Sequence, residues 1–321
     1  MNNSSPKIGV IIPLYNQKEY IGEAIESVLN QTYPYIKLVV INDGSTDNPI
    51  PILDKYNEDI TLINQKNKGL AAARNRGLRE CDCKYIQFLD ADDFLHKDKI
   101  KLQLEFSESH DADISYCEIA QLEQESRRTY LRYIGEVNDM FSSLYNFWCL
   151  YPLPIHSLLI KNRIFTKYYL FDEELTANED RYFLSKLAAA GISFKYFPFI
   201  GGFRRDHKHS MNKDRLRMLE STIQYYRKLN KELGDDYLSK KFGYTGNKMM
   251  CANLTFVYRN EIANGRTRKE LQRIRKLFKE ENIKFEVEPI PLRFKKLKLG
   301  RFFFSAYLKR LFNILFISNS L

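Results

Sequence analysis

The chain has 321 residues, of which 44% are hydrophobic and 28% charged. This ordinary globular composition excludes a fibrous protein and a chain that is disordered throughout. The formal charge is +10, but residues 289–321 alone hold seven basic and no acidic side chains. The basic excess therefore belongs largely to the C-terminal end. The five cysteines are scattered, which predicts free thiols.

The first third of the chain predicts alternating strands and helices. Short β-branched apolar runs indicate buried strands, and the segments between them have apolar residues at helical spacing. Such alternation favours a mostly parallel sheet that binds ligands at the carboxyl ends of its strands. The predicted strands are 7–14, 36–41, 60–64 and 85–89, and the predicted helices are 19–31, 69–78 and 97–107.

The rest of the chain is predicted to be irregular at first and then helical. We expect helices at 138–148 and 178–190, strands at 156–165 and 192–197, and long charged helices at 214–233, 236–262 and 267–281. The change of texture predicts an α/β domain over residues 1–212 and a helical region over residues 213–321.

Acidic residues follow the fourth predicted strand directly, at Asp90, Asp92 and Asp93. Two carboxylates at a strand exit can approach one cation, because Mg²⁺ and Mn²⁺ bind between one or two carboxylates and a substrate phosphate. The alternative is a solvated acidic turn that caps the following helix. The strand before the turn and the third carboxylate make the two interpretations about equally strong.

Two other segments lie at the presumed ligand edge. Asp43 ends the second strand, where its carboxylate could accept a hydrogen bond from a nucleobase or simply form a tight capping turn. Small residues open the helix that starts at Gly69, and Arg74 on this helix could lean toward a diphosphate. The alternative is a small-residue packing face with Arg74 in solvent.

Glu179 and Asp180 open a later helix. They suit a general base that faces the ligand edge, but acidic residues at this position also simply stabilise the helix dipole. The basic loop 204–210 holds His207 and His209, and either could bind a metal or contact phosphate.

Taken in order, these segments resemble the motifs of glycosyltransferase family 2. The resemblance covers about residues 7–210 and implies a GT-A fold, a Rossmann-like and mostly parallel sheet flanked by helices, here with a C-terminal helical extension. It also implies an inverting glycosyltransferase of the hexosyltransferase class that uses a nucleotide sugar, first of all a UDP-sugar, and a divalent metal, Mg²⁺ or Mn²⁺. The matching segments are Ile11–Asn16, Asp43–Asp47, Ala73–Asn75, Leu89–Asp93 and Glu179–Asp180.

The roles that the resemblance implies fall into three groups. Donor-binding residues lie within 7–110, and the acceptor side and the base lie within 111–212. The metal ligand would be Asp92, joined by His207 or His209, of which we name His207. Asp180 would be the catalytic base, with Glu179 as its partner. The nucleobase would be held by Pro13, Tyr15, Asn16 and Asp43, the diphosphate approached by Arg74, and the ribose by Asp90.

Two other functions remain open. A nucleotidyltransferase also uses a metal and carboxylates beside an α/β sheet, but it usually has a Gly-rich basic loop after the first strand, which 14–19 lacks. A non-enzymatic nucleic-acid-binding protein would suit the charge of +10 and the basic, Phe-rich C-terminus. The acidic strand end argues against it, so we expect no nucleic-acid partner.

The C-terminal segment 301–317 has apolar residues on one helical face and is interrupted by charges, so it is too polar to span a membrane. It could be a helix docked on the protein, but we favour a basic amphipathic tail at an anionic membrane surface. The start of the chain, 1–7, does not look like a secretion signal. We therefore expect a cytoplasmic enzyme in peripheral contact with the cytoplasmic face of the membrane, acting on a glycan or lipid-linked glycan in bacterial surface polysaccharide or lipid-linked oligosaccharide synthesis.

Overall fold

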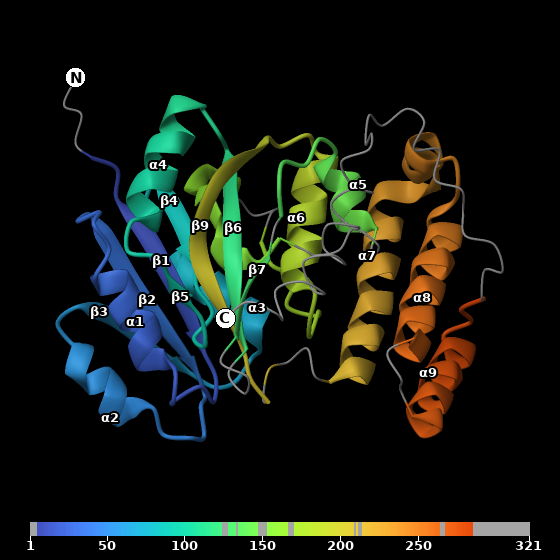
Figure 1. Cartoon of the computed structure of the whole chain (residues 1–321), viewed down its shortest axis with the longest axis horizontal. Helices are drawn as coiled ribbons and strands as arrows, with labels where there is room; N and C mark the ends of the chain where they lie inside the picture. The colour runs from blue at the N-terminus through green and yellow to red at the C-terminus, as the bar shows by residue number, and fades with distance from the viewer. Residues whose placement is uncertain are drawn as a thin grey trace, which may run out of the picture.

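The computed structural model describes most of the chain as one mixed sheet with helices on both faces and a helical region at one side (Figure 1). The predicted α/β sheet with a C-terminal helical extension is confirmed. The predicted tail lies outside the described residues, as does His209. The residues described are 5–123, 128–132, 134–146, 153–165, 170–208, 210, 214–263 and 267–284.

The first half of the sheet is parallel, with the strand order β3-β2-β1-β4. Alternate side chains of β1 enter different cores: Val10 and Ile12 pack with α1 and α4, whereas Ile11 packs with α3 and α6. The sheet is therefore covered on both faces, as its apolar strands predict. The elements are β1 (Ile8–Leu14), α1 (Ile21–Leu29), β2 (Ile36–Asp43), α2 (Ile50–Leu53), β3 (Ile60–Gln65), α3 (Leu70–Arg79), β4 (Tyr85–Phe88) and α4 (Lys99–Ser109).

Three of the five strands described in the second half of the sheet were not predicted from the apolar pattern, whereas the other two lie within or overlap the predicted strands 156–165 and 192–197. β6 was missed because Ser115, Glu118 and Gln121 interrupt its apolar run. The first two are nonetheless buried: Gln103 donates to Ser115, and the backbone amides of residues 134 and 135 donate to Glu118. The strands are β5 (Phe94–Leu95), β6 (Ile114–Glu123), β7 (Arg128–Arg132), β8 (Leu158–Lys161) and β9 (Phe194–Asp206).

The direction of these strands decides which residues meet. β8 is antiparallel to both β4 and β6, and β9 is parallel to β6, so β9 points the same way as β4. The end of β9 therefore lies at the same edge of the sheet as the ends of β2 and β4. This brings the segment after Asp206 close to the acidic turn after β4, more than 100 residues earlier in the chain.

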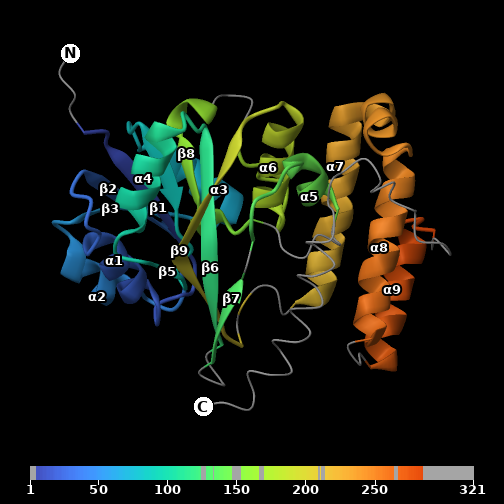
Figure 2. The same cartoon turned by 45° about the horizontal axis from the view of Figure 1, so that its top comes forward.

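The helical region packs beside the sheet through two shorter helices. α5 (Met140–Tyr145) and α6 (Glu179–Ala189) lie between the sheet and α7, and α8 and α9 lie beyond it (Figures 1 and 2). The break predicted between residues 233 and 236 coincides with a kink of α7 at Gly234, but the single helix predicted over 236–262 is wrong, because α7 ends before Gly243; both glycines are at positive φ. The helices are α7 (Arg215–Phe242), α8 (Gly246–Ala263) and α9 (Arg268–Glu280).

No helix in the described part of the chain has the length and apolar character to cross a membrane. Four of the five cysteines are described, and all four are buried free thiols, as predicted. The domain boundary near residue 212 stays a prediction.

Candidate active site

Arg74 is the centre of a buried ionic cluster. Its Nη1 donates to Oε1 of Glu179 at 2.5 Å and its Nη2 donates to Oδ1 of Asp90 at 2.8 Å. Arg74 is 1% exposed and Glu179 3%. The small residues of α3 explain this burial, because they let the helix pack closely on β1: a β-carbon at Gly77 would lie only 2.4 Å from Cγ2 of Ile11. Arg74 is thus neither in solvent nor on a simple packing face, and it joins the turn after β4 to the start of α6.

The charges of this Arg74 cluster (Arg74, Asp90 and Glu179) perturb one another. Burial alone would lower the pKa of Arg74, but the carboxylates of Asp90 and Glu179 outweigh it and raise that pKa. Burial also works to raise the pKa of Asp90, and Arg74 overcomes it, so that this pKa is lowered. The pKa of Glu179 is raised to about 7 because burial outweighs its contact with Arg74. The guanidinium therefore keeps the Asp90 carboxylate ionised, whereas the carboxyl group of Glu179 has a pKa close to neutral pH.

Asp180, the predicted base, follows Glu179 but has different surroundings. It is partly exposed, and its Oδ1 accepts a hydrogen bond from the backbone amide of Arg181 at 2.6 Å. The chain enters α6 through Asn178 in the left-handed conformation, at φ 59°, and Asn178 is tied to α7 through Thr222. Burial raises the pKa of Asp180, and Arg74 opposes that rise. A carboxylate with a raised pKa is a better proton acceptor than an ordinary one.

The turn after β4 brings Asp92 to His207, the residue that we named as a metal ligand. Oδ2 of Asp92 lies 3.0 Å from Nε2 of His207. Their side chains are 22% and 3% exposed respectively. The structure thus joins two predicted metal ligands that are far apart in the sequence, and leaves the carboxylate partly open.

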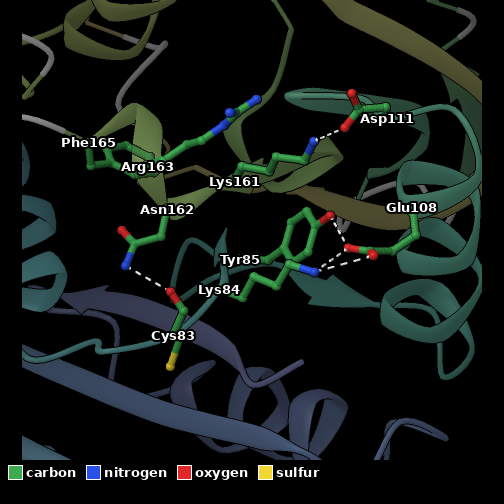
Figure 3. Close-up of a pocket in the computed structure, with 9 residues that line it drawn as sticks. All are labelled: Cys83, Lys84, Tyr85, Glu108, Asp111, Lys161, Asn162, Arg163 and Phe165. Atoms are coloured by element: carbon green, nitrogen blue, oxygen red, sulfur yellow. Dashed lines mark hydrogen bonds and ion pairs between the residues drawn. The ribbon is translucent and has the colours of Figure 1, made fainter. Parts of the chain in front are cut away.

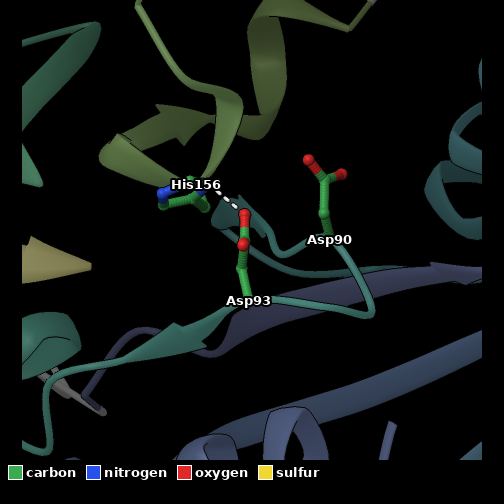
Figure 4. Close-up of side chains that lie close together, drawn as sticks. All are labelled: Asp90, Asp93 and His156. Carbon is green, nitrogen blue, oxygen red and sulfur yellow. Dashed lines mark ion pairs between the residues drawn. The ribbon is translucent and has the colours of Figure 1, made fainter. Parts of the chain in front are cut away.

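Asp93, one residue further on, is enclosed. Its Oδ1 accepts from the backbone amide of Arg205 at 2.8 Å, and its Oδ2 lies 3.1 Å from Nδ1 of the buried His156. Figure 4 shows the Asp93 carboxylate directed at the His156 ring, with Asp90 to one side. One ligand atom from each of these three residues lies within 4.8 Å of the others, so they form a second group that could hold a cation. Burial, and then the charges of Asp92 and Asp90, raise the pKa of Asp93 well above its usual range.

The loops after β1 and β2 form the predicted nucleobase side. Asn16 adopts the left-handed conformation, with φ 53°, and its Oδ1 accepts from the amide of Thr46 at 2.7 Å. The amide of Asn16 in turn donates to Oγ of Ser45 at 3.1 Å. Tyr15 is 47% exposed, whereas Pro13 is buried within β1. The two loops are thus fastened together and present one aromatic ring to solvent.

Asp43 is enclosed by its own chain. Its Oδ1 accepts from Nε2 of Gln65 and the amide of Lys68, and its Oδ2 accepts from the amide of Gly69, at 2.7 to 2.9 Å. Gly44 is required beside it, because φ is +70° and a β-carbon would lie 2.7 Å from the amide nitrogen of Asn67. Asp43 therefore orders the loop before α3.

A hollow of about 680 Å³ lies elsewhere. Figure 3 shows that it surrounds the start of β4 and the end of β8, which is the edge of the sheet opposite to the acidic turn. Its cations are already paired: Lys84 with Glu108, Lys161 with Asp111 and Arg163 with Asp113. We therefore do not assign the donor to this hollow.

Sequence reasoning missed the contributions of His156 and Arg205. His156 lies in the 3₁₀ turn Ile155–Ser157, where no local pattern marks it. Arg205 lies in the basic segment 204–210, where only the histidines were considered as site residues, so its contacts with the acidic turn were not predicted. Both residues come close to the acidic turn after β4 only because of the order of the strands in the sheet.

The chain is similar in sequence to known glycosyltransferases. Residues 9–166 match the family model "Glycosyl transferase family 2". The putative teichuronic acid biosynthesis glycosyltransferase TuaG of Bacillus subtilis is 36% identical over 129 residues, which is 39% of this chain and 51% of TuaG. Uncharacterized glycosyltransferases of Rickettsia felis, R. bellii and R. conorii are 37–41% identical over 123–139 residues, and the match spans only about a fifth of their length.

Solved structures share the fold at low sequence identity. TarS of S. aureus, residues 1–349, in complex with UDP-GlcNAc aligns over 86% of this chain and 80% of that chain, with a TM-score of 0.62 and 18% identity. The mannosyltransferase PcManGT of Pyrobaculum calidifontis, in complex with GDP-Man and Mn²⁺, aligns over 87% and 80%, with a TM-score of 0.57 and 17% identity. The motif order, the fold and the family model agree: residues 9–166, just under half of the chain, match glycosyltransferase family 2.

Proposed function

We propose that the chain transfers a hexose from a nucleoside diphosphate, first of all UDP, to an acceptor hydroxyl with inversion at the anomeric carbon. The observation that carries this proposal is the bridge made by Arg74 between Asp90 and Glu179. Through it, the partly open carboxylates of Asp92 and Asp180, each near one end of the bridge, come to the same edge of the sheet. A metal-binding group and a general base are what sugar transfer from a diphosphate requires.

On the donor side, the fastened loops after β1 and β2 support a nucleobase site, with the exposed ring of Tyr15 available for stacking. Asp90 lies beside this region as a carboxylate that Arg74 keeps ionised, which suits hydrogen bonds from ribose hydroxyl groups. We propose that Arg74 acts on the donor partly through Asp90, since both of its Nη atoms are already engaged.

Asp92 and His207 fit a divalent cation. Bonds of about 2.1 Å at right angles place neighbouring ligand atoms about 3 Å apart, and the observed separation is 3.0 Å. A divalent ion held there would offset the negative charge that develops on the leaving diphosphate. An imidazole nitrogen favours Mn²⁺ over Mg²⁺, which prefers oxygen ligands. We prefer this pair to the Asp90, Asp93 and His156 group, because both carboxylates of that group already accept hydrogen bonds.

On the acceptor side, we propose Asp180 as the base that takes the proton of the attacking hydroxyl as the new bond forms. A positioned base contributes roughly 10²- to 10⁴-fold to the rate. Attack opposite to the leaving diphosphate in a single displacement inverts the anomeric carbon. Glu179 holds Arg74 in place instead of accepting the proton.

Release of nucleotide from a panel of UDP- and GDP-sugars, with Mn²⁺, Mg²⁺ or EDTA, tests the proposal. We expect metal-dependent release that Asp92→Ala reduces by about two orders of magnitude or more. The exposed carboxylate of Asp82 gives the matched control, and Asp82→Ala should retain full activity. Full turnover in EDTA removes the metal from the mechanism. Salt-dependent RNA binding without any nucleotide release supports the nucleic-acid-binding alternative instead.

We further propose a glycan or lipid-linked glycan acceptor in surface polysaccharide synthesis, approached from the cytoplasmic side of the membrane. The similarity to TuaG supports the acceptor class, and the basic residues after residue 289 support contact with anionic lipid. Flotation with anionic and neutral liposomes measures that contact. Exchange of Lys295, Lys296 and Lys298 for Glu should abolish binding to anionic liposomes, and unchanged flotation contradicts the membrane proposal.

A further inference from the structure

Arg205 joins the acidic turn to the end of β9, two residues before His207. Its backbone amide donates to Oδ1 of Asp93 at 2.8 Å, and its side-chain Nε donates to the carbonyl oxygen of Asp92 at 3.1 Å. Both bonds cross more than 100 residues of sequence. Asp92 and His207 are the two proposed metal ligands. Arg205 thus fixes the backbone of the turn that carries Asp92 against the segment that carries His207.

The guanidinium of Arg205 is held by further contacts. It lies 5.1 Å from the ring centre of Tyr20 and 5.5 Å from that of Phe94, and its Nη2 forms an ion pair with Glu23 at 2.5 Å. The Tyr20 ring is also 4.9 Å from the ring of His207. The start of α1, the turn after β4 and the end of β9 therefore meet at this one side chain, whose exposed fraction is 15%.

We infer that Arg205 is a positioning residue that sets Asp92 and His207 at the separation a divalent ion needs, before the ion arrives. This inference rests on the proposed function, because it assumes that these two residues bind the metal. Arg205 does not touch the ion or the donor in this role. It restricts the movement of the Asp92 backbone directly and that of the His207 ring through Tyr20. Little conformational entropy is therefore lost when the ion binds.

The shape of the Arg205 side chain matters here more than its charge. A planar guanidinium can donate to a carbonyl from Nε, pair with a carboxylate from Nη2 and lie against two aromatic rings at once. A lysine has one compact ammonium group and cannot make this set of contacts. Arg205→Lys and Arg205→Gln should therefore be impaired to a similar degree, whereas a purely electrostatic role would be retained in Arg205→Lys.

The test measures binding of Mn²⁺ to the full chain in the presence of UDP, by the electron paramagnetic resonance signal of free Mn²⁺, together with kcat and the metal concentration that gives half-maximal rate. Disturbed partners of metal ligands cost about 10- to 100-fold in metal affinity. We expect that loss in both Arg205 variants, with kcat largely restored at saturating Mn²⁺. Arg163→Gln, on an exposed arginine at the opposite edge of the sheet, is the matched control and should bind Mn²⁺ normally.

Tyr20→Leu and Tyr20→Phe extend the test to a residue outside the turn. Tyr20→Leu removes the ring beside His207 and should weaken Mn²⁺ binding, whereas Tyr20→Phe keeps the ring and should not. Unchanged Mn²⁺ affinity in the Arg205 variants and in Tyr20→Leu, or full affinity in Arg205→Lys alone, overturns the inference. Failure of the proposed function looks different: Asp92→Ala then binds Mn²⁺ as tightly as the unaltered chain, or the unaltered chain binds none.

Discussion

Two pairs of consecutive acidic residues face the same edge of the sheet, and each pair has one enclosed and one open member. In the turn after β4, Asp93 is 4% exposed and bonded to the amide of Arg205, whereas Asp92 is partly open beside His207. At the start of α6, Glu179 is 3% exposed and bonded to Arg74, whereas Asp180 is partly open. The enclosed members fasten segments of the fold together, and the open members are the proposed metal ligand and the proposed base.

The difference between the two pairs lies in what encloses the buried carboxylate. Glu179 meets a full positive charge, but Asp93 meets a backbone amide and the ring of His156. Removal of a partner should therefore affect stability most at the Arg74 cluster, because an uncompensated buried charge is left behind. Removal of an open carboxylate should affect catalysis with little change in stability.

The largest effect is expected when the two members of the α6 pair are exchanged separately. Asp180→Asn is nearly isosteric but cannot accept a proton, so kcat should fall roughly 10²- to 10⁴-fold with donor binding retained. Glu179→Gln keeps an acceptor for Arg74 and should reduce kcat far less. Steady-state kinetics and donor titration measure both. An active Asp180→Asn beside an inactive Glu179→Gln means that the two roles have to be swapped.

The next largest effect concerns stability. Arg74→Met leaves Asp90 and Glu179 without their cation and should lower the free energy of unfolding by about 3–5 kcal/mol. Arg76 on the same helix supplies the control, because its ion pair with Glu80 is partly exposed and Arg76→Met should change stability by less than about 1 kcal/mol. Urea denaturation compares the two. Equal losses would falsify the distinction between enclosed and open charges.

A smaller effect should appear in the pH dependence of stability. Glu179 has a pKa of about 7 in the folded chain and 4.5 as its ordinary value, so the folded state binds more protons between these values. Its contribution is therefore present at low pH and is lost as the pH rises through 7, at most about 1.4 kcal/mol per pH unit. Glu179→Gln should lack this decline between pH 4.5 and 7. Parallel stability curves for the two proteins contradict the raised pKa.

The smallest effect is expected at Asp43, which is enclosed but lies at the proposed nucleobase side. Asp43→Ala should raise the donor KM about tenfold, roughly one hydrogen bond, and change kcat little, because the base does not react. It should also loosen the loop before α3, whose amides at Lys68 and Gly69 lose their acceptor. Initial rates measured over a range of donor concentrations give KM and kcat. An unchanged KM shows that another group holds the base.

Local sequence patterns predicted strands and helices correctly where the buried residues form a regular apolar pattern. The strands that became β1, β2, β3 and β4 were all predicted, as were α1 and α3 between them, because the strands are largely apolar; the short helix α2 was not predicted. The pattern failed at β6, where Ser115 and Glu118 are buried with partners from other segments. The break predicted between residues 233 and 236 coincides with the kink at Gly234, but the pattern failed at Gly243, where a glycine at positive φ ends α7 inside the helix predicted over 236–262.

By itself the sequence determined the family motifs, the acidic and basic residues they contain, and the edge of the sheet at which they gather. Only the tertiary structure decided which of these residues are enclosed and which are open. Arg74 is buried because small residues let α3 pack closely on β1. Asp92 meets His207 because β8 is antiparallel to both β4 and β6 and β9 is parallel to β6, so that β9 and β4 run in the same direction. Both outcomes depend on contacts between segments that are far apart in the sequence, and such contacts leave no trace in the local pattern of either segment.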